Sequence, residues 1–262
     1  MDEINLKPVA YVISPVEEPD EMPLGGKDAI IEFLPEYVEA LQGLEENSHV
    51  WILSWFHKSP RDLLKIRPGK VNPDLPEYGV FALRSYTRPN PIGLSLVTLE
   101  RVEGKRVYVR GLDAIGGTPV LDIKPYFEND TIFSPFTPYI RGKSREMRQG
   151  MIRKHAFVHH GEECMDMLIG VRMAAIAEDR FGHLNSSDLI VRVQGSPCLA
   201  DTIQGVSRAR LANPPRFIYI NEENGSETTW TKNGQTLTIR LKGAFNRDEL
   251  EKLADEDLFD IF

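Results

Sequence analysis

The first 125 residues are divided by closely spaced turn residues into short apolar runs, which leave little room for helices. These runs are rich in β-branched and aromatic residues, which favour extended backbone. A single short helix is expected at 36–42, because Pro35 and Gly43 flank it. Many short strands with one helix favour a barrel or curled sheet. The expected strands lie at 9–13, 29–33, 49–56, 79–83, 94–100, 106–111 and 120–123.

The second half of the chain alternates helical and extended patterns. Two helices are predicted, at 164–180 with Gly182 as its cap and at 199–209. Asn233-Gly234 indicates a hairpin, and Asn246 three residues before Glu249 resembles the capping box of a last helix. The sequence therefore predicts an α+β fold with an N-terminal barrel and a C-terminal α+β domain. The strands expected in this half lie at 188–194, 217–220, 229–232 and 235–241.

A basic, proline-containing stretch separates the two patterns, so we expect domains at 1–130 and 156–262 joined by a linker at 131–155. Charge runs of this kind usually mark solvated connectors, but they can also contact phosphates. The sequence leaves both interpretations open. The basic residues concerned are Arg141, Lys143, Arg145, Arg148, Arg153 and Lys154.

The composition limits the classes of protein that the chain can represent. The net charge of −8 argues against a surface that is basic overall, although it allows a local basic patch. No apolar run approaches the roughly 20 residues that cross a bilayer, and the acidic N-terminus lacks the pattern of a signal peptide. With only Cys164 and Cys198 present, a cytoplasmic protein without a membrane partner is expected.

Two loops in the first half concentrate unusual chemistry. Residues 84–95 place prolines on both sides of Asn90 and end at Gly93, with arginines at the start. Residues 111–126 supply two carboxylates, a Gly-Gly turn and a lysine. Such a rigid pair can hold a small polar ligand through main-chain groups, although ordinary tight turns use the same residues. No GxGxxG motif follows a strand, which argues against a Rossmann fold.

These loops resemble the signature of the TsaA/TrmO-like S-adenosylmethionine-dependent methyltransferase family. The resemblance covers about residues 4–126 and includes Ile13-Ser14-Pro15, the 48–53 run, Phe56-His57 and residues 79–82. It implies a β-barrel domain that binds S-adenosylmethionine and forms a homodimer. The bacterial enzyme methylates N6 of threonylcarbamoyl-adenosine at position 37 of tRNA, so the resemblance makes tRNA a candidate substrate.

Carried over by position, the resemblance implies a set of cofactor-binding residues. His57 is a candidate base, but a histidine at a strand end is as often a hydrogen-bonded structural residue. Asp113 could bind the ribose hydroxyls or lie near the sulfonium, and Arg84 could bind the methionine carboxylate. His57 and Asp113 are therefore the catalytic candidates. The cofactor set is Pro23, Leu24, Gly25, His57, Lys58, Arg84, Leu94, Arg110, Gly111, Leu112 and Asp113.

The second half resembles the FmdE-like family over about residues 157–219. The family pattern His-Gly-His-x-Cys-Pro is replaced here by a run in which Glu162 stands for the second histidine and Met165 for the proline. His160, Glu162, Cys164 and Cys198 could bind zinc or another soft metal. The alternative is a pair of buried free cysteines beside a hydrogen-bonded histidine.

Three functions follow from these patterns. The chain could methylate tRNA, with the basic residues of the 131–155 linker contacting phosphates. It could instead methylate a small molecule or a metal-bound ligand presented by the FmdE-like domain. A third interpretation is a protein that binds S-adenosylmethionine without catalysis.

Overall fold

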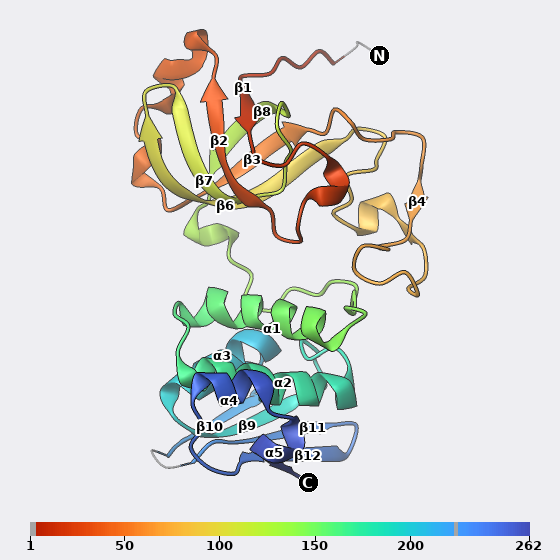
Figure 1. Cartoon of the computed structure of the whole chain (residues 1–262), viewed down its shortest axis with the longest axis vertical. Coiled ribbons are helices and arrows are strands. Elements are labelled where there is room, and N and C mark those ends of the chain that lie inside the picture. The colour runs from red at the N-terminus through yellow and green to blue at the C-terminus, as the bar shows by residue number, and fades with distance from the viewer. Residues whose placement is uncertain (1–3, 223–224) are drawn as a thin grey trace. The chain divides into compact units, whose positions relative to one another are not determined.

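The computed structural model describes residues 4–222 and 225–262, and the chain divides into two compact units (Figure 1). The barrel unit comprises Met1–Arg67 and Pro76–Thr131, and the second unit comprises Pro68–Leu75 and Ile132–Phe262. A closed barrel occupies the first, and helices cover a mixed sheet in the second. The predicted α+β class with an N-terminal barrel is confirmed.

The barrel closes because each strand pairs antiparallel with a neighbour on both sides, in the order β1-β2-β7-β6-β3-β8. Buried and partly exposed residues alternate along β3, so Val50 and Ile52 point into the core. The strands are β1 (Ala10–Ile13), β2 (Lys27–Phe33), β3 (His49–Trp55), β6 (Ile92–Glu103), β7 (Arg106–Leu112) and β8 (Pro119–Pro125).

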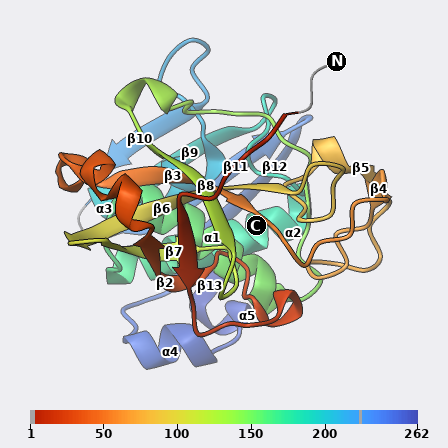
Figure 2. The ribbon, with the colours of Figure 1, turned by 90° about the horizontal axis from the view of Figure 1, so that it is seen from above.

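The strand expected at 79–83 is wrong. A two-residue strand, β5 (Tyr78–Gly79), pairs with β4 (Lys65–Ile66), and residues Val80–Ala82 form a 3₁₀ turn. Arg88 Nη2 donates to the carbonyls of Val80 and Leu83, at 3.0 and 2.6 Å, which holds the chain in a bend. Figure 1 shows β4, and Figure 2 shows both β4 and β5, to one side of the barrel strands.

The single helix expected in the barrel unit is a 3₁₀ helix, η2 (Pro35–Leu41). Proline sets its first turn, and the next element begins after Gly43, whose φ of 82° is in the left-handed region that favours glycine. Further 3₁₀ turns are η1 (Pro19–Glu21), η3 (Leu44–Glu46), η4 (Val80–Ala82) and η5 (Glu128–Asp130).

The second unit is built in layers: α2 (Met165–Phe181) and α3 (Pro197–Ser207) lie on the sheet, and α1 (Arg145–His160) lies on these two helices (Figure 1). The predicted Asn233-Gly234 hairpin and the Asn246–Glu249 capping box are both present. The sheet order β10-β9-β11-β12-β13 follows β9 (Ile190–Gly195), β10 (Phe217–Asn221), β11 (Glu227–Lys232), β12 (Gln235–Leu241) and β13 (Phe259–Ile261), with α4 (Arg247–Lys252) and α5 (Asp255–Leu258) near the C-terminus.

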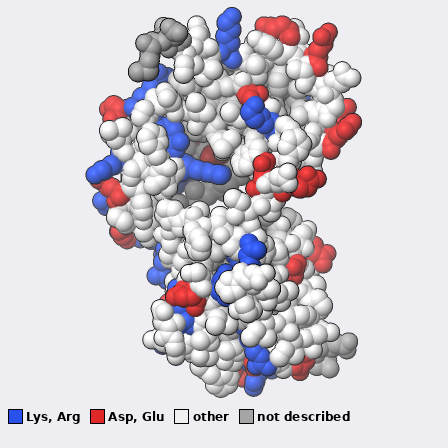
Figure 3. Space-filling view, turned by 180° about the vertical axis from the view of Figure 1, so that it is seen from behind, with Lys and Arg blue, Asp and Glu red and all other residues white. Residues whose placement is uncertain are grey.

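Much of the segment expected as a linker is helix α1, which begins at Arg145. Most of its basic residues pair with carboxylates from the second unit: Arg141 and Arg148 contact Asp179 at 2.9 and 2.8 Å, and Arg145 contacts Asp179 and Asp255. These arginines therefore stabilise the second unit instead of forming an open basic patch. Figure 3 shows acidic and basic side chains interspersed over the face it presents. Among the helices described, none is long and apolar enough to cross a membrane.

Candidate functional site

A pocket lies at one end of the barrel, where several connections converge. The end of β3 and the start of β6 are paired there, since Trp55 lies opposite Ile92. The end of β7 reaches the same rim, because Leu112 lies opposite Lys27 at the start of β2. The lining residues are Pro19, Met22, Phe56, His57, Lys58, Ser59, Arg84, Tyr86, Asp113, Ala114, Ile115 and Thr118.

Hydrogen bonds between segments far apart in sequence fix the rim of this pocket. Lys58 Nζ donates to the carbonyl of Glu17 at 3.0 Å and to the carboxylate of Glu18 at 2.7 Å. Ser59 Oγ donates to the carbonyl of Tyr86. The Arg84 guanidinium lies 5.9 Å from the centre of the Trp51 ring, which places a cation beside the pocket.

Four of the predicted cofactor residues meet in this pocket: His57, Lys58, Arg84 and Asp113 all line it. They come from the loops after β3, before β6 and after β7. The predicted site residues therefore converge from three separate stretches of sequence.

The Pro23-Leu24-Gly25 turn and Gly111 are tightly packed main chain. Gly26 N donates to Pro23 O at 3.1 Å, and a Cβ on Gly26 would lie 2.5 Å from the main chain of Leu112. Gly25 and Gly111 both have positive φ, at 95° and 83°. This turn therefore lies against the end of β7, and Leu24 is exposed there.

Three predicted residues point away from the pocket lining. Leu112 is fully buried in the barrel core, so its side chain is unavailable to a ligand. Leu94 is exposed on the outside of β6. Arg110 lines a separate hollow and pairs with Glu100.

Apolar lining residues are the part that sequence reasoning did not assign. Met22 and Ile115 form a small buried cluster with Val16. Thr118, which also lines the pocket, donates its main-chain N–H to the carbonyl of Ile115 at 3.3 Å. In the sequence, Met22 is only an apolar residue next to Pro23. Ile115 and Thr118 lie inside the 111–126 loop, whose polar residues drew attention instead. A pocket of this kind combines an apolar wall with a few polar groups, which suits a small organic ligand.

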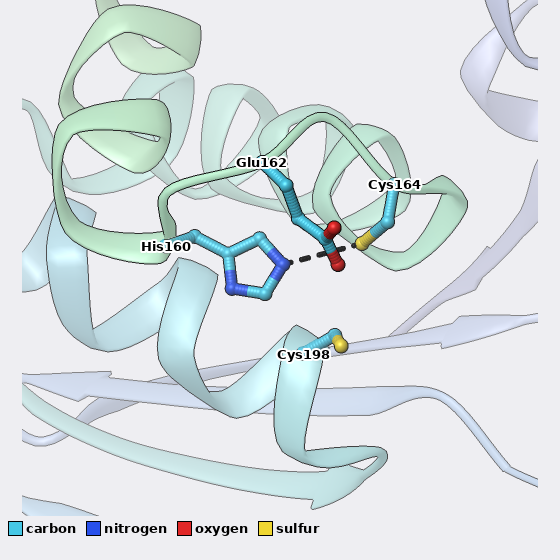
Figure 4. Close-up of side chains that lie close together, drawn as sticks. All are labelled: His160, Glu162, Cys164 and Cys198. Carbon is cyan, nitrogen blue, oxygen red and sulfur yellow. Dashed lines mark hydrogen bonds between the residues drawn. The ribbon is translucent and has the colours of Figure 1, made fainter.

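A second cluster lies in the second unit, where helix ends meet (Figure 4). His160 ends α1, Cys164 is the N-cap of α2, and Cys198 is in the first turn of α3. The donor atoms of these three residues and of Glu162 all lie within 4.8 Å of one another. All four residues named from the sequence are thus brought together.

Hydrogen bonds orient the histidine of this cluster. His160 Nδ1 lies 3.0 Å from Asp201 Oδ2, and His160 Nε2 lies 3.3 Å from Cys164 Sγ. The imidazole is 7% exposed, so its orientation is set by these partners. Burial raises the pKa of the Cys198 thiol, and the nearby Cys164 thiol raises it further. One nitrogen of His160 thus faces a carboxylate, and the other faces the donor set.

Comparison with known proteins identifies both units. The family model described as the tRNA-methyltransferase O N-terminal domain matches residues 11–130. A "Probable S-adenosyl-L-methionine-binding protein" of Methanothermobacter thermautotrophicus is 42% identical over 48% of this chain and 93% of its own length. The chain belongs to the TrmO family. TrmO-family proteins are S-adenosylmethionine-dependent methyltransferases, so the predicted family of the barrel unit is confirmed.

The second unit also matches a family model, described as "FmdE, Molybdenum formylmethanofuran dehydrogenase operon", over residues 159–257. A "Probable S-adenosyl-L-methionine-binding protein" of Archaeoglobus fulgidus is 32% identical over 83% of this chain. The aligned part is 62% of that relative, less than two thirds of its length. The predicted union of a TrmO-like and an FmdE-like domain is confirmed.

Other relatives cover smaller parts of the chain. The "tRNA (adenine(37)-N6)-methyltransferase" of Mus musculus is 54% identical over 35% of this chain and 21% of its own length. The crystal structure of TrmO from Pseudomonas aeruginosa is 34% identical over 55% of this chain and 66% of that chain, with a TM-score of 0.44.

Proposed function

We propose that the chain transfers the methyl group of S-adenosylmethionine to the N6 amine of an adenosine in tRNA. The observation that carries this proposal is the convergence of His57, Arg84 and Asp113 on one pocket of a TrmO-family barrel. The name of the mouse relative supports N6 of adenosine as the acceptor, although that match covers 35% of this chain. The acceptor is therefore a proposal of its own, separate from the family.

The residues of the pocket suit the donor's charges. Arg84 can bind the methionine carboxylate, and Asp113 can accept hydrogen bonds from the ribose hydroxyls. The apolar wall formed by Met22, Phe56 and Ile115 can take the adenine ring. Of the other predicted cofactor positions, Pro23, Leu24 and Gly25 lie in a turn close to the pocket, and this turn packs against Gly111 at the end of β7.

Methyl transfer requires little chemistry from the protein, because the sulfonium carbon is already electrophilic. The amine nitrogen attacks the methyl carbon in line with the breaking carbon–sulfur bond, and the sulfur leaves as a neutral thioether. The nitrogen must then lose a proton. His57 lines the pocket and is the residue placed to accept it, directly or through water.

We further propose that the active form is a homodimer in which a second copy encloses the donor. The pocket volume of about 90 Å³ is well below the roughly 300–1,000 Å³ of typical ligand sites. Beside the pocket, Ile92, Leu94 and Leu96 are exposed at alternate positions of β6, opposite residues of β3. Sedimentation should give a dimer with donor present, and a monomer at micromolar concentration would contradict this assembly.

The decisive experiment for the acceptor is mass spectrometry of tRNA from cells that lack this chain. We expect one adenosine to lose the mass of a methyl group, and purified protein with S-adenosylmethionine should restore it. Calorimetry with the donor separates the two parts of the proposal. Donor binding with an unaltered tRNA profile would retain the barrel assignment and exclude tRNA as substrate.

We also propose that the second unit binds a metal at the cluster of His160, Glu162, Cys164 and Cys198. A donor set of one imidazole, one carboxylate and two thiolates suits zinc. His160 also fits, because metal-bound histidines usually hold a carboxylate on the other ring nitrogen, here Asp201. Bound zinc would act as a Lewis acid. His160, Cys164 and Cys198 would hold it, while Glu162, which is exposed, is the ligand most easily exchanged.

This cluster also supports a different acceptor. A small molecule bound at the His160–Cys198 cluster could receive the methyl group in place of tRNA. The FmdE-family match of residues 159–257 favours this alternative. Loss of a methylated small metabolite, with tRNA unchanged, in cells lacking the chain would support it. Donor binding without any methylated product would favour the non-catalytic binding function.

A further inference from the structure

Two arginines of the second unit gather around one aromatic ring. The guanidinium carbons of Arg208 and Arg210 lie 5.8 and 5.3 Å from the centre of the Phe133 ring. The ring of His159 meets the same phenyl group edge-on, with 5.9 Å between centroids. We call Phe133, Arg208 and Arg210 the Phe133 surface. It is a flat aromatic group with two cations held beside it.

The main chain fastens the parts of the Phe133 surface together. Ser134 Oγ donates to the carbonyl of Arg208 at 2.8 Å, and Arg216 Nη2 donates to the same carbonyl at 3.2 Å. Arg208 itself ends α3 in the left-handed conformation, with φ of 52°. The segment that carries Phe133 is therefore attached to the end of a helix. This attachment lowers the entropy that a ligand would lose in ordering the surface.

The charges of the Phe133 surface lack acidic partners. Within residues 4–222 and 225–262, no carboxylate pairs with Arg208 or Arg210. Burial lowers the pKa of Arg208, and no acidic group offsets it. Other arginines of this unit do have carboxylate partners, namely Arg141, Arg145, Arg148, Arg153, Arg172, Arg240 and Arg247.

The neighbourhood adds further positive charge. Desolvation and then the charges of Arg208, His183 and Lys154 lower the pKa of His155, so these groups lie close enough to act on one imidazole. Arg208 and Lys154 thus place two cations near His155, while Asp201 pairs with His159 at 3.2 Å on the side where the His159 ring contacts Phe133. With no carboxylate paired to them in the described part of the chain, Arg208 and Arg210 are available to an anionic ligand, which their charges favour.

We propose that the Phe133 surface binds the backbone of single-stranded or loop RNA, with phosphates on Arg208 and Arg210 and a base on Phe133. Proteins hold unpaired nucleotides with arginines beside an accessible aromatic ring, and the Phe133 ring is partly exposed. This inference rests on the proposed tRNA substrate and deepens it. The arginines of the 131–155 segment were the phosphate contacts expected from the sequence, but carboxylates neutralise them. Arg208 and Arg210 take that role in this proposal.

The test is RNA binding by the full chain, measured by fluorescence anisotropy at several salt concentrations with a labelled single-stranded oligoribonucleotide and with tRNA. We expect Arg208→Gln and Arg210→Gln each to weaken binding by roughly three- to tenfold, and each to lower the salt slope by about one. Phe133→Leu should weaken binding while leaving the salt slope unchanged, because it removes stacking but no charge. Donor binding should be the same in all variants.

Arg192→Gln is the matched control. Arg192 is exposed on β9, between the buried Val191 and Val193, so alternation puts it on the sheet face away from the helices. It also lacks a carboxylate partner in the described part of the chain, and its printed contact is Gln194. Its loss should change RNA affinity by less than about twofold.

The outcomes separate this inference from the proposed function. RNA affinity and salt slope unchanged in Arg208→Gln/Arg210→Gln would overturn the Phe133 surface, even if tRNA is methylated. RNA binding that depends on both arginines, without methylation of tRNA, would support the surface and remove the proposed substrate. Displacement of the oligoribonucleotide by inorganic pyrophosphate at equal phosphate concentration would assign the site to a small anion and overturn RNA.

Discussion

The barrel pocket and the His160–Cys198 cluster are formed by different structural elements. The pocket lies where loops leave the strands, and close to its lining the tight turn at Gly25 and Gly26 packs against Gly111 at the end of β7. The cluster lies where three helix ends meet, and its functional atoms are all on side chains. One site has many lining residues from several loops, and the other depends on four particular groups.

This difference predicts how each site responds to mutation. A pocket lined by many residues loses little when one exposed side chain is removed, because the remaining contacts are retained. A metal site made of four donors loses its function when two are removed, because the remaining pair cannot complete the coordination shell. Conversely, a Cβ added at a tight turn should destabilise the barrel. The same substitution should leave metal binding by the cluster unchanged.

The largest expected effect is on metal content. Cys164→Ser with Cys198→Ser should abolish zinc binding, because both thiolates of the proposed site are lost while the structure retains its fold. Metal analysis of the purified full chain measures this directly. Donor binding by the barrel should be unchanged. Stoichiometric zinc in the double variant would exclude this site.

A matched pair of carboxylates sharpens the same test. Glu162 belongs to the cluster, whereas its neighbour Glu163 pairs with Arg153 and Arg247. Glu162→Gln should therefore lower zinc affinity, measured by competition with a chelator, and Glu163→Gln should leave it unchanged. Equal effects would mean that general negative charge, and not coordination, holds the metal.

An intermediate effect is expected on the stability of the barrel. Gly26→Ala should destabilise it by roughly 2–4 kcal/mol, because φ is +76° and the new Cβ would lie 2.5 Å from the main chain of Leu112. Gly43→Ala is the control: its φ is +82°, but nothing lies within 4 Å of an added Cβ, so about 1 kcal/mol is expected. Chemical unfolding measures the free energy of unfolding of both variants. Equal losses in the two would mean that the positive φ alone sets the cost and that the contact of the added Cβ with Leu112 contributes nothing.

Local rules predicted the regular elements well. The run at 49–56, rich in Trp, Val and Ile, forms β3, and Asn233-Gly234 forms the predicted turn. Local rules failed where distant partners decide. The arginines expected in an open linker are paired with Asp179 and Asp255, which lie far along the chain, and the run at 79–83 is bent by Arg88.

The same distinction holds for the sites. His160, Glu162 and Cys164 are close in sequence, so their proximity could be expected, and the addition of Cys198 rested on family resemblance. Arg208 and Arg210 gave no such signal. They flank an alanine in an ordinary stretch, and only the fold brings Phe133 to them while leaving both without a carboxylate. The net charge of the chain does not say which arginines will have a carboxylate partner in the folded protein.

The smallest expected effect is on donor affinity in the barrel, and it compares two arginines that the sequence assigned to one site. Arg84 lines the pocket, while Arg110 lines another hollow and pairs with Glu100. Because Arg84 is exposed, its contact with the donor carboxylate is screened by water, and Arg84→Ala should weaken binding by only about 1 kcal/mol, roughly fivefold. Arg110→Ala should leave calorimetric affinity unchanged. A loss of a hundredfold in Arg84→Ala would mean that this side chain dominates the site, and the contrast between a pocket of many contacts and a cluster of four donors would fail. An equal loss in both variants would place Arg110 in the donor site and show that the ligand extends beyond the pocket lined by Arg84.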